Sequence, residues 1–140
     1  MSLKMSVAQR QTFLADPHVG IVSIPRESRG PLTVPIWYDY TPNGPLWMIT
    51  DRSSIKGKLL ARATRISLCV QTETVPYQYV SVEGTFTLRD ATRDELLQMA
   101  IRYLGESGGR AYTNSTDHGD SMLVSITPQT WYTVDYTQST

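Results

Sequence analysis

The sequence consists largely of short segments rich in β-branched and aromatic residues, separated by glycine, proline and asparagine. Such segments favour strands, and the residues between them favour turns. The clearest turn is Thr41–Pro45, which reads TPNGP, because its Asn-Gly pair favours a tight hairpin between the flanking segments. Hairpins join antiparallel strands, so this pattern predicts a mainly β protein.

Six strands are expected from this pattern, at residues 19–24, 32–40, 46–50, 66–71, 77–88 and 121–136, the last interrupted by Pro128. Helices are expected at residues 6–14, 55–63 and 90–104. In the third helix Thr92 and Glu95 form a capping box, and Gly105 ends the helix. For residues 108–119 we expect a loop or a short helix. Together these elements predict an antiparallel barrel with helices on its outside.

The length of 140 residues fits a single domain, 1–140, within which we expect residues 1–5 to be disordered or added during cloning. Thirteen basic and thirteen acidic residues give no net charge, which argues against a nucleic-acid binder. No apolar run approaches the ~20 residues of a membrane span. The single cysteine, Cys69, cannot form an intramolecular disulfide, so a cytoplasmic location is expected.

The basic residues are unevenly distributed. Residues 52–72 contain five of them and no acid. Where this segment begins, a predicted strand meets a predicted helix, and hydroxyls with a lysine at a helix start can hold a phosphate. The residues that supply such a cradle are Thr50, Ser53, Ser54 and Lys56. The alternative is a solvated basic helix face.

Aromatic residues cluster near the same segment. Trp37, Tyr38, Tyr40 and Trp47 flank the predicted hairpin, and further aromatic residues stand near residues 77–79 and 131–136. Beside a phosphate cradle, they suit a planar ring cofactor with a phosphate tail. Ordinary core packing is the alternative. No hydrolase motif or metal-ligand spacing is present, so we predict neither a catalytic residue nor a metal site.

The order of motifs resembles one known family. PIWYDY is followed by a turn and then by LWMITDRSSIK, LLARATRISLCV and YQYVSVEG. This series resembles the pyridoxamine 5′-phosphate oxidase-like split β-barrel family. The later segments RYLGESGGRAY and ITPQTWYTVDY are similar to its subgroup of small deazaflavin-dependent proteins. The resemblance covers most of the chain. It implies a six-stranded antiparallel split β-barrel and a homodimer that binds FMN or a deazaflavin (coenzyme F420) at the subunit interface.

The resemblance also implies which residues bind this cofactor. The family pattern T-N-x-x-S-R-K reads TDRSSIK here, so Thr50, Ser54 and Lys56 match the residues that hold the phosphate and the ribityl chain. The family lays strand backbone against the ring system, and the corresponding residues are Val34, Pro35, Ile36 and Trp37.

Further positions follow from the same resemblance. Met48 and Ile49 would line the cofactor from the adjacent strand. Gln78 and Tyr79 match the position where the partner subunit reaches the cofactor. Trp131 matches a family tryptophan that approaches the ring from the C-terminal strand.

Two departures argue against the pyridoxamine phosphate oxidase reaction itself. The strand before the hairpin reads VPIWYD, without the Arg and Lys of the oxidase pattern, and the substrate-binding motif R-x-H-D-R is absent. We therefore expect an oxidoreductase that transfers hydride to or from a small unsaturated substrate. A non-catalytic protein that stores or senses a flavin, a deazaflavin or a haem-like ring is the alternative.

Overall fold

The computed structural model describes residues 2–138 and is mainly β. The strands are β1 (Gly20–Ile24), β2 (Leu32–Ile36), β3 (Tyr38–Tyr40), β4 (Leu46–Asp51), β5 (Ile66–Gln71), β6 (Gln78–Asp90) and β7 (Ser121–Asp135). The helices are α1 (Val7–Ala15), α2 (Ile55–Leu60) and α3 (Arg93–Ser115), and a 3₁₀ turn, η1 (Tyr136–Gln138), follows β7. None of the helices in residues 2–138 has the length and apolar character needed to cross a membrane.

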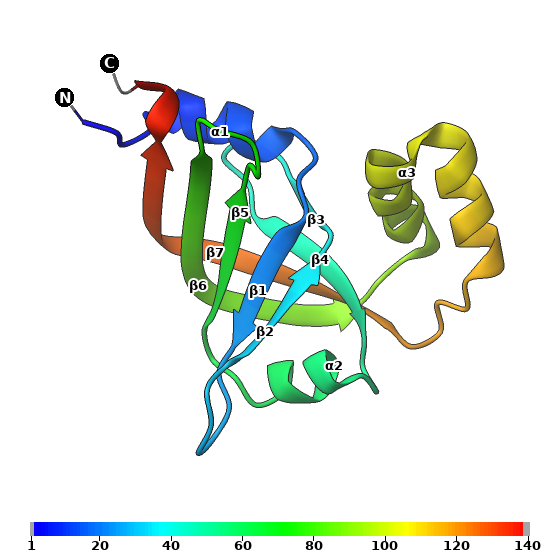
Figure 1. The fold of residues 1–140 in the computed structure, drawn as a ribbon. Helices are drawn as coiled ribbons and strands as arrows, with labels where there is room; N and C mark the ends of the chain where they lie inside the picture. Colours follow the sequence, from blue (N-terminus) through cyan, green and yellow to red (C-terminus); the bar gives the residue numbers. More distant parts are fainter. Residues whose placement is uncertain (1, 139–140) are drawn as a thin grey trace.

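The strands form one antiparallel sheet in the order β2-β1-β5-β6-β7-β4-β3. The prediction of a mainly β fold with flanking helices is confirmed. The count of six strands is corrected to seven, and the sheet is not a closed barrel, because β2 and β3 are its two edges. Figure 1 shows the sheet curving strongly along β6 and β7.

The extra strand arises because the expected strand 32–40 breaks at Trp37. β2 pairs with β1 at one edge of the sheet, whereas β3 pairs with β4 at the other. The backbone N–H of Tyr38, just after the break, donates to the hydroxyl of Tyr103 in α3 at 3.1 Å. One continuous β-rich run therefore crosses from one edge to the other, and Trp37 lies at the crossing.

The long strands β6 and β7 bend where their register shifts, between Glu83 and Gly84. Gly84 is opposite Pro128, so the proline does not interrupt β7 but lies at the irregularity. A Cβ at position 84 would lie 1.9 Å from the carbonyl oxygen of Thr127, so only glycine fits there. Such a bulge bends a pair of strands and increases their twist.

The hairpin between β3 and β4 forms as expected, with a different central pair. The N–H of Gly44 donates to the carbonyl of Thr41 at 2.8 Å, which places Pro42 and Asn43 at the centre of the turn. Asn43 has a φ of 67°. Proline followed by a residue with positive φ is typical of a type II turn.

The curved sheet encloses the hydrophobic core, and α1 lies across the end where the chain begins and ends (Figure 1). Residues 1–5 were expected to be disordered, but the structure shows residues 3–5 in contact with the sheet. Met5 is buried and its N–H donates to Oγ1 of Thr133 at 3.0 Å, while the carbonyl of Leu3 accepts from Asp135 at 2.8 Å. Met1 lies outside the described residues.

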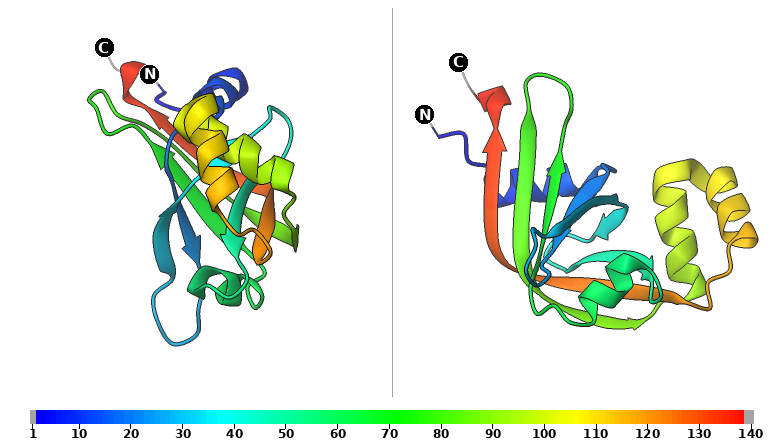
Figure 2. Two further views of the ribbon diagram at one scale, coloured as in Figure 1. Left: turned by 90° about the vertical axis from the view of Figure 1, so that its right-hand side faces the viewer. Right: turned by 60° about the horizontal axis from the view of Figure 1, so that its bottom comes forward.

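Helix α3 connects β6 to β7 and stands away from the sheet (Figures 1 and 2). Thr92 and Glu95 form the expected capping box. At Gly105 the backbone leaves the helical region (φ 79°, ψ 175°), and a second helical segment runs on to Ser115. This conformation is open almost only to glycine. α3 therefore consists of two halves that meet at a kink.

Arg102, in the first half of α3, ties the helix to the rest of the chain. Its guanidinium donates to four backbone carbonyls, those of Leu14 (3.0 Å), Ala15 (2.9 Å), Asp16 (3.1 Å) and Tyr38 (2.9 Å). Three of these carbonyls lie at the C-terminal end of α1, where they have no partner within the helix and where a cation is favourable.

We expect Arg102→Met to lower the free energy of unfolding by about 3 kcal/mol, because it leaves several charge-assisted hydrogen bonds unmade. It also removes the ion-pair partner of Asp39, whose largely buried carboxylate lies 3.5 Å from the guanidinium. Urea denaturation would measure the effect. Arg110→Met is the control on the same helix, because Arg110 is exposed and pairs with Glu106 one turn away. Equal stability of the two variants would contradict this role.

Candidate functional site

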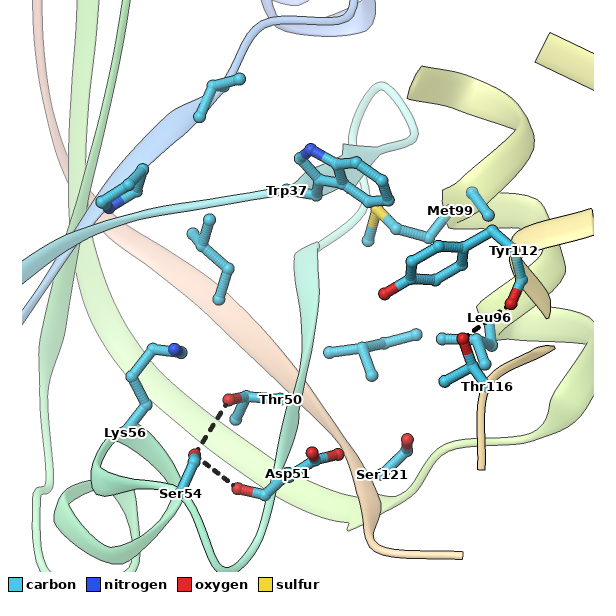
Figure 3. A pocket seen from close by; sticks show the side chains of 15 residues that line it. Trp37, Thr50, Asp51, Ser54, Lys56, Leu96, Met99, Tyr112, Thr116 and Ser121 are labelled. Carbon is cyan, nitrogen blue, oxygen red and sulfur yellow. Dashed lines mark hydrogen bonds between the residues drawn. The ribbon is translucent and has the colours of Figure 1, made fainter. Parts of the chain in front are cut away.

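A cavity of about 580 Å³ lies between α3 and the sheet. Its walls come from the end of β2 and Trp37, from β4, from α2, from both halves of α3 and from the start of β7. Figure 3 shows hydroxyl and ammonium groups at one end of this cavity and aromatic and apolar side chains at the other.

The polar end is built where β4 runs into α2. Ser54 is the N-cap of α2, and its Oγ accepts from the N–H of Gly57 at 3.1 Å. The same hydroxyl donates to the carbonyl of Asp51 at 2.7 Å and lies 3.3 Å from Oγ1 of Thr50. The proton of Ser54 is therefore engaged within the protein, and its oxygen orients the hydroxyl of Thr50.

Lys56 projects from α2 into the cavity (Figure 3). The side chain is partly buried, and the ion pairs found among residues 2–138 do not include it. By contrast, the neighbouring Arg52 pairs with Asp90 at 2.5 Å. An ammonium group that faces a cavity without a carboxylate partner favours an anionic ligand.

The other end of the cavity is formed by Trp37 and α3. The indole of Trp37 stacks on Tyr103 with the ring centroids 4.8 Å apart and the planes 8° apart. Burial raises the pKa of Tyr103, so its hydroxyl keeps its proton and donates to the carbonyl of His18 at 2.7 Å. These contacts fix the plane of the indole at the cavity wall.

A family model described as pyridoxamine 5′-phosphate oxidase matches residues 7–135. The chain belongs to this family. A search of curated proteins found no match to the sequence.

Several solved structures share the fold of this family. The conserved hypothetical protein Rv2991 from Mycobacterium tuberculosis is 20% identical with a TM-score of 0.78, and the match covers 96% of this chain and 88% of that one. An F420 reductase is 18% identical, with a TM-score of 0.72 and coverage of 87% and 94%. An FAD and heme binding protein from Mycobacterium smegmatis is 16% identical, with a TM-score of 0.71 and coverage of 94% and 71%.

More than half of the residues that the family resemblance assigned to the cofactor come together in the cavity. They are Pro35, Ile36, Trp37, Ile49, Thr50, Ser54 and Lys56. They all lie within residues 35–56, on β2, β4 and α2 or beside them. Four strands separate β2 from β4 in the sheet order, so the curvature of the sheet brings these residues together.

Three of the predicted residues do not line the cavity, and their role in binding stays a prediction. Met48 is fully buried in the core, because its neighbour Ile49 takes the cavity-facing position. Ser53 bonds instead to the carboxylate of Asp120 through its hydroxyl and its N–H, at 2.5 and 3.1 Å, and these bonds lower the pKa of Asp120. Val34 packs against the core.

Gln78, Tyr79 and Trp131 also lie outside the cavity. The N–H of Gln78 donates to the hydroxyl of Thr72, and Tyr79 stacks on Tyr132. The guanidinium of Arg10 lies over the ring of Trp131, 4.0 Å from its centroid. Gln78 and Tyr79 were expected to reach the cofactor of a partner subunit. Their role in binding stays a prediction.

Sequence reasoning missed the residues that α3 and its flanks contribute to the cavity. They are Leu96, Met99, Ala100, Tyr112, Thr116 and Ser121. The spacing of Leu96, Met99 and Ala100 indicated a shared helix face without indicating what it covers. Tyr112 falls in the segment for which a loop or short helix was expected. It ends the segment RYLGESGGRAY, to which the family resemblance assigned no role.

The side chains in the cavity fit a phosphorylated ring cofactor. Lys56 offers an ammonium and Thr50 a hydroxyl at one end, and Ile36, Ile49 and Trp37 offer apolar surface beyond them. A phosphate would take a charge-assisted hydrogen bond from Lys56, and Thr50 would donate to it by turning its hydroxyl away from Ser54, whose own proton is engaged with the carbonyl of Asp51.

Proposed function

We propose that the protein is an oxidoreductase that binds FMN or a deazaflavin (coenzyme F420) in this cavity. The observation that carries the proposal is the partly buried ammonium of Lys56, which faces a cavity whose opposite wall is aromatic. The similarity in fold to an F420 reductase and to an FAD and heme binding protein supports a ring cofactor in this place.

The bound cofactor would supply the hydride chemistry, so the protein has to bind, orient and exclude water. Lys56 and Thr50 would hold the phosphate. The backbone of Pro35 and Ile36 would lie along the ring. The buried face of α3, with Leu96 and Met99, would keep water from the reacting end.

The direct test is a parallel titration of the purified protein with FMN and F420, followed by fluorescence. We expect one of them to bind and, once reduced, to be oxidised in the presence of a quinone or an enone. Failure of both cofactors to bind would contradict the proposal, and the cofactor that binds identifies the chemistry.

The second candidate is a non-catalytic protein that stores or senses a flavin, a deazaflavin or a haem-like ring. The similarity to the FAD and heme binding protein from Mycobacterium smegmatis favours it. The same experiment distinguishes the two candidates, because tight binding without oxidation of the reduced cofactor supports storage or sensing.

Lys56→Ala is expected to weaken cofactor binding by about 1.5–3 kcal/mol, the usual contribution of a hydrogen bond to a charged group. Lys58→Ala is the matched control, because Lys58 lies on the same helix but is exposed and does not line the cavity. Fluorescence titration would compare the two. If both variants bound the cofactor like the unchanged protein, Lys56 would have no role in holding it.

We further propose a homodimer, formed through the outer face of β6 and β7. Tyr132 on β7 leaves 63% of its surface exposed, and Tyr77 and Tyr136, just beyond the ends of β6 and β7, leave 47% and 44%. Tyrosine is enriched at interfaces. Light scattering is expected to give the mass of two chains, and Tyr132→Glu is expected to shift it toward one. Val7→Glu, an equally apolar-to-acidic change at an exposed position of α1, should leave the mass unchanged. A monomer at micromolar concentration would exclude the dimer.

A cytoplasmic location remains part of the proposal. It is supported by the single thiol, because Cys69 has no second cysteine with which to pair.

A further inference from the structure

The hydroxyl and ammonium groups account for one end of the cavity, and the aromatic end has no assigned ligand. Tyr112 reaches it from the second half of α3, and its hydroxyl points into the cavity (Figure 3). The residue is 41% exposed, and within residues 2–138 no hydrogen bond is found for this hydroxyl. It is therefore a donor available to a ligand.

Tyr112 is held in this position by its helix. Oγ of Ser115 and Oγ1 of Thr116 both donate to its backbone carbonyl, at 3.0 and 2.6 Å. The next residue, Thr113, is buried, and its carbonyl accepts from Arg93 at the start of α3 at 3.4 Å. The end of the second half is thus tied to the beginning of the first.

The two halves of α3 also touch closer to the kink. A Cβ at Gly109 would lie 2.7 Å from the Cα of Ile101, so the glycine permits direct backbone contact. Gly105 supplies the reversal between the halves. Figure 2 shows the second half folded back beside the first. Tyr112 therefore stands on a supported wall rather than on a free loop.

Trp37 and Tyr112 form one aromatic surface. Their ring centroids are 5.7 Å apart and their planes are inclined by 51°. A planar molecule between two rings needs a separation of roughly 7 Å, two van der Waals contacts, so none fits between them. A ligand must instead lie against the cavity side of this surface, with the hydroxyl of Tyr112 at its margin.

These observations define the chemistry of the ligand. The aromatic surface and the buried side chains of Leu96 and Met99 favour a flat, apolar molecule. The phenol hydroxyl donates a hydrogen bond to an acceptor on the ligand, and a carbonyl oxygen is an acceptor that lies in the plane of a flat conjugated molecule. A quinone or a conjugated ketone combines both features.

We propose that Trp37 and Tyr112 form the substrate subsite, and that the Tyr112 hydroxyl donates a hydrogen bond to the carbonyl oxygen of a planar quinone or enone. This inference rests on the proposed function for the cofactor beside it. It assigns Tyr112 the binding and orientation of the substrate, and no proton transfer is required of it.

The test measures binding without turnover, by equilibrium dialysis of 2,3-dimethyl-1,4-naphthoquinone against the protein. Both reactive ring positions of this quinone are blocked, so the thiol of Cys69 cannot add to it. We expect Tyr112→Phe to weaken binding roughly 3- to 10-fold, the effect of one neutral hydrogen bond. The hydrocarbon 2,3-dimethylnaphthalene has the same shape without the carbonyls, and its binding should not change.

Leu104→Ala is the control variant, because Leu104 is exposed on the same helix and does not line the cavity. It should bind the quinone like the unchanged protein. The proposal is overturned if the unchanged protein does not bind the quinone, or if Tyr112→Phe binds it equally well. Equal weakening of the hydrocarbon by Tyr112→Phe would also overturn it, since the loss would then reflect packing.

Titration of the same variants with FMN and F420 separates this inference from the proposed function. Tyr112→Phe should retain the cofactor affinity of the unchanged protein. If the quinone binds through Tyr112 and neither cofactor binds, the proposed function fails and the subsite stands. If a cofactor binds and the quinone affinity does not depend on Tyr112, the subsite alone fails.

Discussion

The guanidinium of Arg102 holds α3 at its distance from the sheet, and the cavity depends on that distance. Leu96, Met99 and Ala100 of α3 are buried, yet they do not belong to the hydrophobic core that the sheet encloses. Polar contacts join the helix to the body of the protein, those of Arg102 with the end of α1 and those of Tyr103 with the backbone around Tyr38. Because such contacts have a defined geometry, they can hold two surfaces apart, whereas packing alone would close the gap.

The cavity draws its two ends from different parts of the chain. The polar end comes from β4 and α2, whose positions are set by the sheet, and the aromatic end comes from Trp37 and α3. Trp37 links them, since it stands where the chain crosses from β2 to β3 and its indole stacks on Tyr103. The arrangement suits a cofactor fixed by the sheet and a substrate fixed by the helix.

Much of the fold could be predicted from the sequence, because hairpins and helix caps depend on neighbours. The capping box at Thr92 and the turn at Thr41–Pro45 are of this kind. The break at Trp37 could not be predicted, because the backbone N–H that follows it bonds to the hydroxyl of Tyr103, far along the chain. The same distinction applies to the site. Thr50, Ser54 and Lys56 stand close together in one motif and were recognised, whereas Tyr112 was not. Its role depends on a helix kink and on a wall that only the folded chain assembles.

The position of α3 between two paired strands has a consequence for how such a protein changes over time. Asp90 at the end of β6 is directly opposite Met122 near the start of β7, so the chain leaves and re-enters the sheet at neighbouring positions. Residues 91–120 are therefore one long hairpin connection, which can be lengthened, shortened or exchanged while every strand keeps its partner. Descendants of one ancestral gene can in this way acquire new selectivity by replacing a single segment, with Lys56 and the sheet left as they were.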